Sequence, residues 1–260
     1  MISLEKSFKK KGYVIIDIKD KSFFKKIYEE INKSKILSIN NNKKFSSKCI
    51  ELQNKIYKKK HHIKVLKDNF SDIKKAIGVK SKKELAITTF VHFRGVKKKT
   101  KKGKRKFVGL HRETFYSDFD YTKHQINISL PIQNYNKNNS LKIISGSHKI
   151  PDKKILTKKL SSFESGVKKF SVDHRLGLPY NPKVIVSGIN TSKASRTNLK
   201  TGQIILFSAM LIHGNGSNNY LKPRFSIDFG LIKKKYLKGK KIKDHSLISY
   251  AENKKYWSSL

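Results

Sequence analysis

The sequence predicts an α+β fold, mainly β, in which helices come first and many strands follow. Residues 22–31 carry apolar side chains at near-helical spacing. From about Leu85 onward, β-branched and aromatic residues gather in short runs that are typical of strands. Helices followed by many strands indicate an α+β domain that is built on a barrel or a sandwich.

No internal repeat and no Pro/Ser-rich linker divides the chain of 260 residues. We therefore expect one domain over residues 1–260. Within it we expect a mainly helical part at 1–84, a β core at 85–232 and a basic, Lys-rich tail at 233–260.

Two helical segments are expected in the first third of the chain. The first has four apolar residues on one face: Phe23, Phe24, Ile27 and Ile31. The second runs from about residue 50 to residue 77 and contains His61 and His62. Adjacent histidines on a helix point about 100° apart and chelate one ion poorly. We interpret both histidines as surface residues.

The expected strands differ in their patterns. Short β-like runs occupy residues 13–16, 86–93, 141–144 and 184–186. Residues 125–132 and 224–229 alternate between an apolar and a polar face. Residues 203–212 form a nearly continuous apolar run, as expected for a central strand that is buried on both faces. Residues 151–183 are irregular and basic, and indicate a long insert with a short helix.

The charge of the chain allows two interpretations. Lys and Arg number 60 against 18 Asp and Glu, which gives a formal net charge of +42. Only six of these basic residues are Arg, whereas nucleic-acid binders usually cluster their charge and use Arg at fixed forks. Diffuse Lys, together with abundant Asn and Ile, can arise from AT-biased coding; alternatively, the positive field steers an anionic substrate or surface. The densest basic run, residues 97–106, is interpreted as a solvated loop.

Several protein classes are excluded by composition. Cys49 is the only cysteine, which excludes a disulfide framework and any Cys-based zinc or iron–sulfur site. No run approaches the roughly 18 apolar residues that a membrane span needs. The first residues show no apolar region of a secretory signal. A reducing cytoplasm is the expected location.

The sharpest chemical signal is the sequence His111-Arg112-Glu113. In an extended segment, residues i and i+2 point the same way, so one imidazole and one carboxylate can meet a single metal ion. His213 is the best candidate for a third ligand, because it ends the apolar run and precedes a glycine-containing turn. Two histidines and one carboxylate leave three positions of an octahedral ion open, as in non-heme Fe(II) oxygenases. On its own, His-x-Glu is a weak motif that occurs by chance in many chains.

A cationic residue near His213 strengthens this interpretation. Arg224 follows Pro223 and shares a strand face with Ser226. A guanidinium can bind a carboxylate through two hydrogen bonds, and a hydroxyl two residues on can add a third. Arg224 and Ser226 would thus anchor the far carboxylate of 2-oxoglutarate. The alternative for Arg224 is a salt bridge with an acid such as Asp228.

The polar face of residues 125–132 is a candidate wall of the cavity. Its residues are Gln125, Asn127 and Ser129, and the opposite face is wholly apolar and should pack under the helices. The polar face can then bind co-substrate or substrate, unless it is a solvent-facing edge. His92 and Arg94 alternate on another strand and could face the same cavity. The remaining histidines are interpreted as structural or surface residues, with His148 stabilising a turn: His124, His148 and His174.

Several stretches resemble, in order, the phytanoyl-CoA dioxygenase-like branch of the Fe(II)/2-oxoglutarate oxygenases. They are FKKKGYVII at residues 8–16, LHRE at 110–113, ISLPIQNYNKNNSLKIISGSH at 128–148 and GQIILFSAMLIHGNGSNNYLKPRFSID at 202–228. More weakly, the HRE form resembles oxygenases of bacterial carbohydrate-biosynthesis clusters. The resemblance covers about residues 5–232.

The resemblance implies a double-stranded β-helix, a jelly-roll or cupin-like barrel with the N-terminal helices packed on one sheet. It also implies Fe(II) bound by His111, Glu113 and His213, with 2-oxoglutarate held by Arg224 and Ser226 and with O2 as the oxidant. From the polar strand faces we expect Asn127 to contribute to the 2-oxoglutarate site, and Gln125 and Arg94 to face the substrate. Two departures from the family pattern are Glu113 in place of the usual Asp, and a basic hairpin at 96–106.

Three functions remain as alternatives for these residues: a hydroxylase, a basic binding protein and a zinc hydrolase. The leading one is a 2-oxoglutarate-dependent hydroxylase of a small polar metabolite, such as a sugar or an anionic compound. A basic nucleic-acid or anionic-polymer binding protein would show steep salt dependence and need no iron. DNA/RNA-repair oxygenases carry a second Arg after the 2-oxoglutarate Arg, and none follows Arg224. A zinc hydrolase using the same three ligands gives Arg224 and Ser226 no function.

Overall fold

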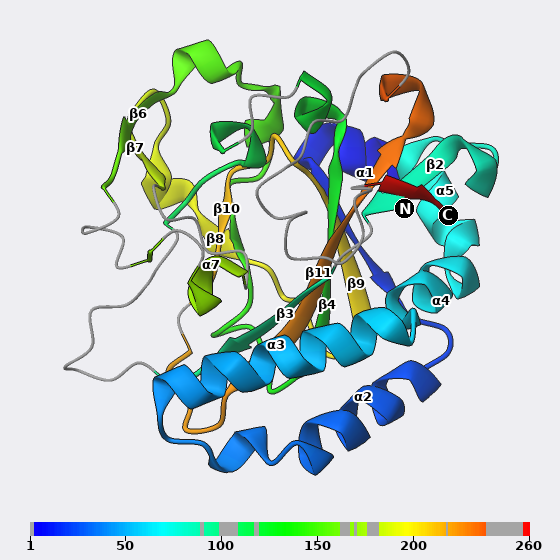
Figure 1. Cartoon of the computed structure of the whole chain (residues 1–260). Helices are drawn as coiled ribbons and strands as arrows, with labels where there is room; N and C mark the ends of the chain where they lie inside the picture. Colours follow the sequence, from blue (N-terminus) through cyan, green and yellow to red (C-terminus); the bar gives the residue numbers. More distant parts are fainter. Residues whose placement is uncertain are drawn as a thin grey trace.

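An antiparallel sheet forms the centre of the computed structural model (Figure 1). The structure describes residues 3–88, 91–98, 109–116, 120–161, 167–168, 171–175, 182–216, 218–237 and 257–260. Six strands of this sheet follow the order β1 (Tyr13–Asp17), β9 (Gln203–Ser208), β4 (Ile126–Gln133), β11 (Arg224–Lys233), β2 (Leu85–Thr88) and β12 (Trp257–Ser259). The seventh strand, β3 (His92–Val96), also pairs with β11.

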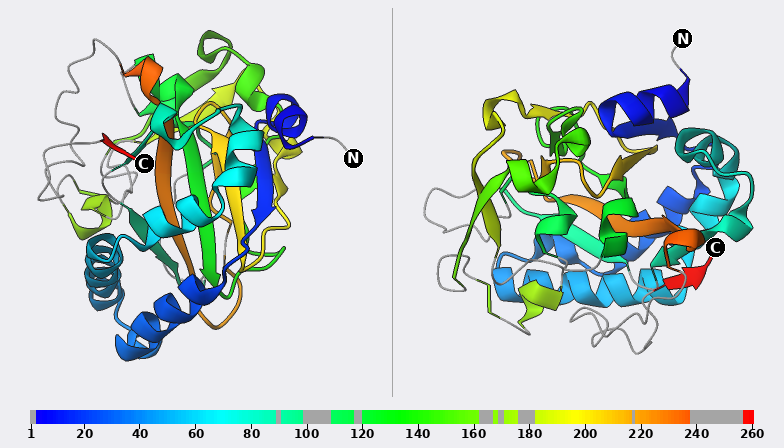
Figure 2. Two further views of the ribbon diagram at one scale, coloured as in Figure 1. Left: turned by 90° about the vertical axis from the view of Figure 1, so that its right-hand side faces the viewer. Right: turned by 90° about the horizontal axis from the view of Figure 1, so that it is seen from above.

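Helices from the first part of the chain cover one face of this sheet, which is called the outer face here (Figures 1 and 2). They are α1 (Leu4–Lys11), α2 (Ser22–Lys33), α3 (Asn42–Lys58), α4 (His61–Asp68) and α5 (Phe70–Ile77). A further short helix is α7 (Val172–Arg175). Short 3-10 turns occupy Ile36–Ser38, Lys82–Glu84, Glu113–Phe115, Asp120–His124, Ser147–Lys149, Asp152–Lys154, Thr191–Lys193 and Lys234–Tyr236.

A small three-stranded sheet lies against the opposite, inner face of the main sheet. Its order is β10 (His213–Gly214), β5 (Lys142–Ile143) and β8 (Ser195–Arg196). An apolar cluster joins the two sheets, since Ile143 packs with Ile205 and Phe207 of β9. A two-stranded ribbon, β6 (Leu156–Lys159) and β7 (Lys183–Ser187), lies on the side away from the helices (Figures 1 and 2). The chain is therefore mixed α+β, with antiparallel sheets and helices on one of them.

The predicted alternation of β4 and β11 separates the two faces of the main sheet. Four alternate residues of each strand join the outer core with the helices: Ile126, Ile128, Leu130, Ile132, Phe225, Ile227, Phe229 and Leu231. The residues between them point to the inner face, because successive side chains of a strand leave on opposite sides. The apolar face of residues 125–132 therefore packs under the helices as expected.

The single helix expected over residues 50–77 is in fact three helices. The chain turns at Lys60, which has a φ of 51°, and again at Asn69. The buried Asn69 side chain donates to the Val65 carbonyl over 2.9 Å and accepts from the Lys19 amide over 3.1 Å. Such side-chain hydrogen bonds to the backbone compete with helix continuation. Apolar spacing alone does not reveal them.

The interpretation of His62 as a surface residue is wrong. Its ring is buried at 1% exposure between Tyr57, at 6.4 Å between ring centroids, and Phe229, at 5.5 Å. The turn at Lys60 re-aims α4, so that His62 faces the sheet. Burial lowers the pKa of His62 to about 3, so the imidazole is neutral. His61 contacts the Phe23 ring and is only partly buried.

Two predicted strands have other bounds than expected: one ends early, and the other is divided in two. The apolar run 203–212 leaves the sheet at Ser208, where the Leu211 amide donates to the Ser208 carbonyl over 2.9 Å in a turn. Its last residues are buried in other clusters, which explains why the run is apolar throughout. The run 86–93 is divided between β2 and β3, and both pair with different parts of β11.

Some expectations fall outside the described residues. The basic run at 97–106 and the hairpin at 96–106 are described only as far as residue 98, and most of the tail at 233–260 is also outside. Within the insert at 151–183, the described parts contain β6, α7 and the start of β7. Among the described residues, no helix has both the length and the apolar character needed to cross a membrane.

Candidate metal centre

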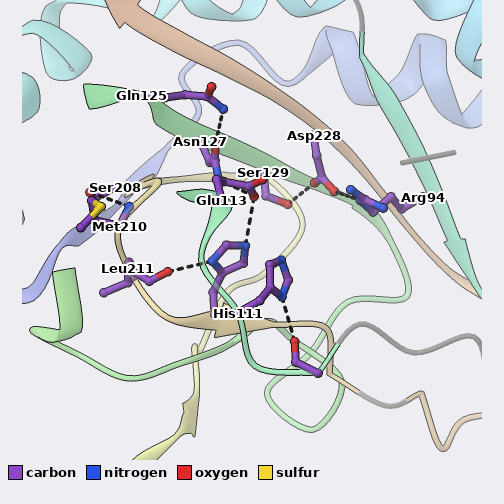
Figure 3. Close-up of polar contacts among 12 residues, drawn as sticks. Arg94, His111, Glu113, Gln125, Asn127, Ser129, Ser208, Met210, Leu211 and Asp228 are labelled. Atoms are coloured by element: carbon purple, nitrogen blue, oxygen red, sulfur yellow. Dashed lines mark hydrogen bonds and ion pairs between the residues drawn. The ribbon is translucent and has the colours of Figure 1, made fainter. Parts of the chain in front are cut away.

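Three side chains from two distant segments of the chain meet at the inner face of the main sheet. His111, Glu113 and His213 each offer one ligand atom, and these atoms lie within 4.8 Å of one another. Figure 3 shows His111 and Glu113 beside the polar residues of β4 and β11. This is the set that the sequence singled out as the metal ligands.

Backbone pairing brings the two histidines together. The His111 amide donates to the His213 carbonyl, and the His213 amide donates to the His111 carbonyl, both over 2.8 Å. The two residues therefore form an antiparallel bridge, and their ring centroids are 4.4 Å apart. The Glu113 amide donates to the Ala209 carbonyl over 3.0 Å, which ties the carboxylate segment to the turn after β9.

The backbone between the first two candidate ligands is extended. Arg112 has φ −129° and ψ 157°, and Glu113 then begins a 3-10 turn. The side chains of His111 and Glu113 consequently leave on one side and that of Arg112 on the other. The i and i+2 geometry expected from the sequence is present even though the segment is only a bridge and a turn.

Hydrogen bonds fix the tautomers of both imidazoles. His111 Nδ1 lies 2.8 Å from the Gly109 carbonyl oxygen, and His213 Nδ1 lies 2.9 Å from the Leu211 carbonyl oxygen. A carbonyl only accepts, so each Nδ1 carries a proton, and Nε2 is the ring nitrogen of each histidine that remains to face a metal ion. Burial lowers the pKa of His111 to about 3, which keeps this ring neutral. Neutral imidazoles with an oriented Nε2 are what a metal ion requires.

The contact between Glu113 and His213 tests whether a cation fits. His213 Nε2 lies 3.5 Å from Glu113 Oε1. Burial raises the pKa of Glu113, but the contact with His213, together with the nearby Arg94, more than offsets this and lowers it to about 2. The carboxylate is therefore ionised, and two acceptors at this distance need a cation between them. A proton on Nε2 or a metal ion supplies it, so the residues fit a metal.

Two amides form a chain that ends on the same carboxylate. Asn127 Nδ2 donates to Glu113 Oε1 over 3.0 Å, and Gln125 Nε2 donates to Asn127 Oδ1 over 2.7 Å (Figure 3). These residues were expected to contact 2-oxoglutarate and substrate, respectively. The structure places both on the inner face, with the Asn127 amide on a candidate metal ligand.

Arg224 is fully buried on the inner face. Its Nη1 donates to the Tyr135 hydroxyl over 2.6 Å and its Nη2 donates to the Gly216 carbonyl over 3.2 Å, while its Nε has no hydrogen-bond partner. Among the described residues, no carboxylate lies within ion-pair distance of this guanidinium. Arg224 therefore does not form the salt bridge with Asp228 that was the alternative interpretation, and Asp228 pairs with Arg94 instead.

Tyr135 is a site residue that the sequence did not identify. It lies beyond the end of β4 in the Asn-rich turn, where no strand period predicts which way a side chain points. Its ring lies 4.7 Å from the Arg224 guanidinium carbon, and its hydroxyl is hydrogen bonded with Ser226. Burial raises the pKa of Tyr135. Arg224, Ser226 and Tyr135 thus form one polar group on the inner face, the same face on which Asn127 contacts Glu113.

Arg94 and Asp228 form a second polar group on the inner face. Arg94 Nε donates to Asp228 Oδ2 over 2.6 Å, and Ser129 Oγ donates to Asp228 Oδ1 over 2.6 Å (Figure 3). Arg94 thus faces the inner side as the sequence suggested, but it is paired with an acid. His92 lies close to Arg94 and Glu113, and burial lowers its pKa to about 3.

The other histidines lie away from these groups. His148 Nε2 is 3.1 Å from the Lys9 carbonyl at the end of α1, and the His124 ring stacks on Tyr236 at 3.7 Å between centroids. His174 lies in α7 and is buried. These placements agree with the structural roles expected for them.

Comparison with known proteins places the chain among oxygenases. The sequence profile of the family described as "Phytanoyl-CoA dioxygenase (PhyH)" matches residues 11–226. The non-heme monooxygenase ThoJ, in its apo form, shares 11% identity with a TM-score of 0.56, over 88% of this chain and 77% of that chain. EvdO2 from Micromonospora carbonacea var. aurantiaca shares 10% identity with a TM-score of 0.58, over 88% and 89% of the two chains.

A third solved structure, AviO1 from Streptomyces viridochromogenes Tue57, shares 10% identity with a TM-score of 0.51, over 88% of this chain and 93% of that chain. No curated protein sequence matches the chain. At these identities the structures show a common fold. The profile match confirms the resemblance predicted from the sequence. Membership of this family, together with the cluster of His111, Glu113 and His213, fits the expected cofactors Fe(II) and 2-oxoglutarate.

Proposed function

Because the chain belongs to the phytanoyl-CoA dioxygenase family, we propose that it is a dioxygenase that hydroxylates a small polar metabolite, such as a sugar or an anionic compound. In this proposal His111, Glu113 and His213 hold Fe(II), and Arg224, Ser226 and Asn127 bind 2-oxoglutarate. The observation that carries the proposal is the meeting of three ligand atoms within 4.8 Å on the sheet face that also holds a buried guanidinium, Arg224, which has no carboxylate partner among the described residues.

The buried guanidinium supports a diacid as the co-substrate. A desolvated cation is costly unless an anion pairs with it. Arg224 has a buried Nε without a partner, and Ser226 and Tyr135 add hydroxyls to the same group. The distal carboxylate of 2-oxoglutarate would satisfy these donors while its keto acid end faces the metal ligands. A zinc hydrolase would leave this group without a role.

In this proposal the residues of the chain bind the metal ion, orient the Glu113 carboxylate and contact the substrate. Iron, when bound, would supply the chemistry by which O2 hydroxylates a C–H bond while 2-oxoglutarate is converted to succinate and carbon dioxide. His111, Glu113 and His213 would hold the ion, and 2-oxoglutarate and O2 would bind to it beside these three residues. Asn127 holds Glu113 Oε1 through its amide, and the side chain of Glu113 remains 33% exposed, so the site is open on one side. Gln125 and Arg94 would contact the substrate.

Three further proposals concern the whole chain. We propose that the main sheet and the small sheet are the two halves of a double-stranded β-helix, since they pack face to face through one apolar cluster. We propose that residues 1–260 form one domain, because β1 of the N-terminal part pairs with β9 of the later part. A cytoplasmic location is proposed from the single, unpaired Cys49.

The proposed function is tested by an anaerobic titration with Fe(II) and 2-oxoglutarate, followed by a metabolite screen for succinate release. The weak visible charge-transfer band of the iron–keto acid complex is expected for the wild-type protein. His111→Ala and His213→Ala should lose the band and the succinate release while the fold survives. If turnover persists in either variant, the assignment of the ligands is wrong. Steep salt-dependent binding of nucleic acid without any band would favour the alternative, a basic polymer-binding protein.

A further inference from the structure

Arg112 is a fully buried cation between two of the three proposed metal ligands. The extended backbone at this residue sends its side chain to the side opposite His111 and Glu113. It therefore has no direct contact with the metal position. A buried guanidinium must find acceptors for its donors, and the partners of Arg112 show what this side chain does.

Within the described residues, the hydrogen-bond acceptors of Arg112 all lie on one short segment, residues 147–152, which is called the brace segment here. Nη1 donates to the Ile150 carbonyl over 2.8 Å and to Asp152 Oδ1 over 2.6 Å. Nη2 donates to the Ser147 carbonyl over 2.6 Å. One side chain thus ties the first ligand segment, residues 111–113, to three points of the brace segment.

Ser147 also reaches the second ligand segment. Its hydroxyl accepts a hydrogen bond of 2.8 Å from the Ile212 amide, directly before His213. The carbonyl of Ser147 therefore holds the segment of His111 and Glu113, while its hydroxyl holds the segment of His213. This residue is buried at 2% exposure, so water competes little for either bond.

The brace segment is itself anchored to the rest of the fold. It begins with the 3-10 turn Ser147–Lys149 and continues into the turn Asp152–Lys154. Just before it, the Gly146 amide donates to the Lys11 carbonyl over 2.8 Å at the end of α1. The segment can therefore resist movement of either ligand segment.

The backbone bridge between His111 and His213 does not by itself define the site. It is an isolated bridge, and β10 has only two residues. A pair of hydrogen bonds leaves the segments free to twist, whereas a second attachment at Arg112 and Ile212 restricts that twist. Positioning of ligands by surrounding hydrogen bonds commonly changes metal affinity by about 10- to 100-fold.

We propose that Arg112 and Ser147 are positioning residues, which fix the separation and orientation of the ligand segments and thereby set the metal affinity. This proposal rests on the metal site of the proposed function. Arg112→Lys keeps the charge but loses the planar fork that reaches three acceptors. Ser147→Ala removes only the hydroxyl and leaves the carbonyl that accepts from Arg112. The two variants therefore loosen one ligand segment each.

The test is a Co²⁺ titration of the full chain, followed by the visible d–d absorption of the bound ion, with thermal unfolding of the metal-free protein measured in parallel. Arg112→Lys should weaken Co²⁺ binding by about 10-fold or more, and Ser147→Ala by a smaller factor. Both should alter the d–d spectrum, because the coordination geometry relaxes. Asp152→Asn should have the smallest effect, because the Asp152 side chain is 45% exposed.

Two remote variants serve as matched controls. Glu30→Gln weakens the ion pairs that link α2 to Lys55 of α3 and to Lys59 just after it, and Ser34→Ala removes the hydrogen bond from its hydroxyl to the Ile31 carbonyl. Both should lower the unfolding temperature without changing the Co²⁺ affinity or spectrum. If Arg112→Lys and Ser147→Ala behave like these controls, the positioning role is wrong. If Arg112→Lys does not fold, the result with Ser147→Ala decides.

The same titration separates this inference from the proposed function. A wild-type protein that binds no Co²⁺ would overturn the metal site, and the positioning role with it. A wild-type protein that binds Co²⁺ with a spectrum unaffected by either variant would overturn the positioning role alone.

Discussion

The two faces of the β4–β11 strand pair differ in their contacts: one face packs against helices of the same chain, and the other holds buried polar groups. On the outer face, alternate residues such as Leu130 and Ile227 are fully buried against the helices. On the inner face, the neighbouring residues include Asn127, Arg224 and Ser226, which are also buried but polar or charged. The outer face is stabilised by apolar burial within the chain. The inner face contains a cation without a described carboxylate partner, which favours a ligand.

This difference separates stability from function within single strands. Residues that are one position apart on β11 contribute to different properties, because successive side chains leave on opposite faces. A change on the outer face should alter the free energy of unfolding and leave ligand affinity alone. A change on the inner face should alter ligand affinity and leave the free energy of unfolding nearly the same.

The largest effect is expected for Arg224→Met. Removing the guanidinium should weaken 2-oxoglutarate binding by at least about 100-fold, because charge-assisted hydrogen bonds to a desolvated carboxylate are lost. The affinity for the metal alone should change little. The free energy of unfolding should stay the same or rise, since a buried cation without an ion partner is replaced by an apolar chain. Calorimetric titration and urea unfolding measure the two quantities; equal losses for metal and 2-oxoglutarate would count against the anchor role.

Leu130→Ala tests the outer face. This side chain is fully buried in the core with the helices, so its truncation should lower the free energy of unfolding by about 2–5 kcal/mol. Urea unfolding measures the loss. The folded fraction should bind Co²⁺ and 2-oxoglutarate with wild-type affinity. A large change in either affinity would show that the two faces are not independent.

His62 makes the outer face sensitive to acid. Burial lowers its folded-state pKa to about 3, whereas an unfolded histidine titrates near about 6.5. Between these values the unfolded state binds more protons, so the free energy of unfolding falls as the pH falls, by up to about 1.4 kcal/mol per pH unit from this group. His62→Leu should remove this contribution. Urea unfolding of both proteins between pH 7 and about pH 4 gives the difference; parallel curves would contradict it.

Cys49 should give the smallest effect. Its thiol is buried on α3, and burial raises its pKa to about 12, so little reactive thiolate forms in the native state. Cys49→Ala should lower the free energy of unfolding by about 1 kcal/mol and leave both ligand affinities unchanged. Reaction of the wild-type thiol with an aromatic disulfide reagent should be slow in buffer and fast in denaturant. Fast labelling of the native protein would place Cys49 at the surface.

The parts of the fold that were predicted correctly depend on local repetition. The apolar side chains of α2 and the alternating residues of β4 and β11 bury the faces that their spacing indicates. The helix breaks at Lys60 and Asn69 were missed, because they depend on a left-handed backbone residue and on a side chain that bonds to remote backbone groups. The end of β9 at Ser208 was missed because apolar residues continue into a buried turn.

The candidate site likewise contains residues that the sequence pattern identified and residues that only distant contacts reveal. The sequence singled out His111, Glu113 and His213, and the structure brings them together. Tyr135 was not identified, because it lies in a turn where no periodicity applies. Arg112 was counted only as one of six arginines, and its role emerges from contacts with residues 147–152.

Composition and spacing alone determined the fold class, the side of each central strand that is apolar, and the residue types able to chelate an ion. These properties follow from covalent neighbours and from the 3.6- and 2-residue periods of helix and strand. Only the folded chain decided which acceptors surround a buried donor, as with Arg112 and Arg224, and where His62 points. Those outcomes depend on contacts between residues that are far apart in sequence, and no local pattern encodes them.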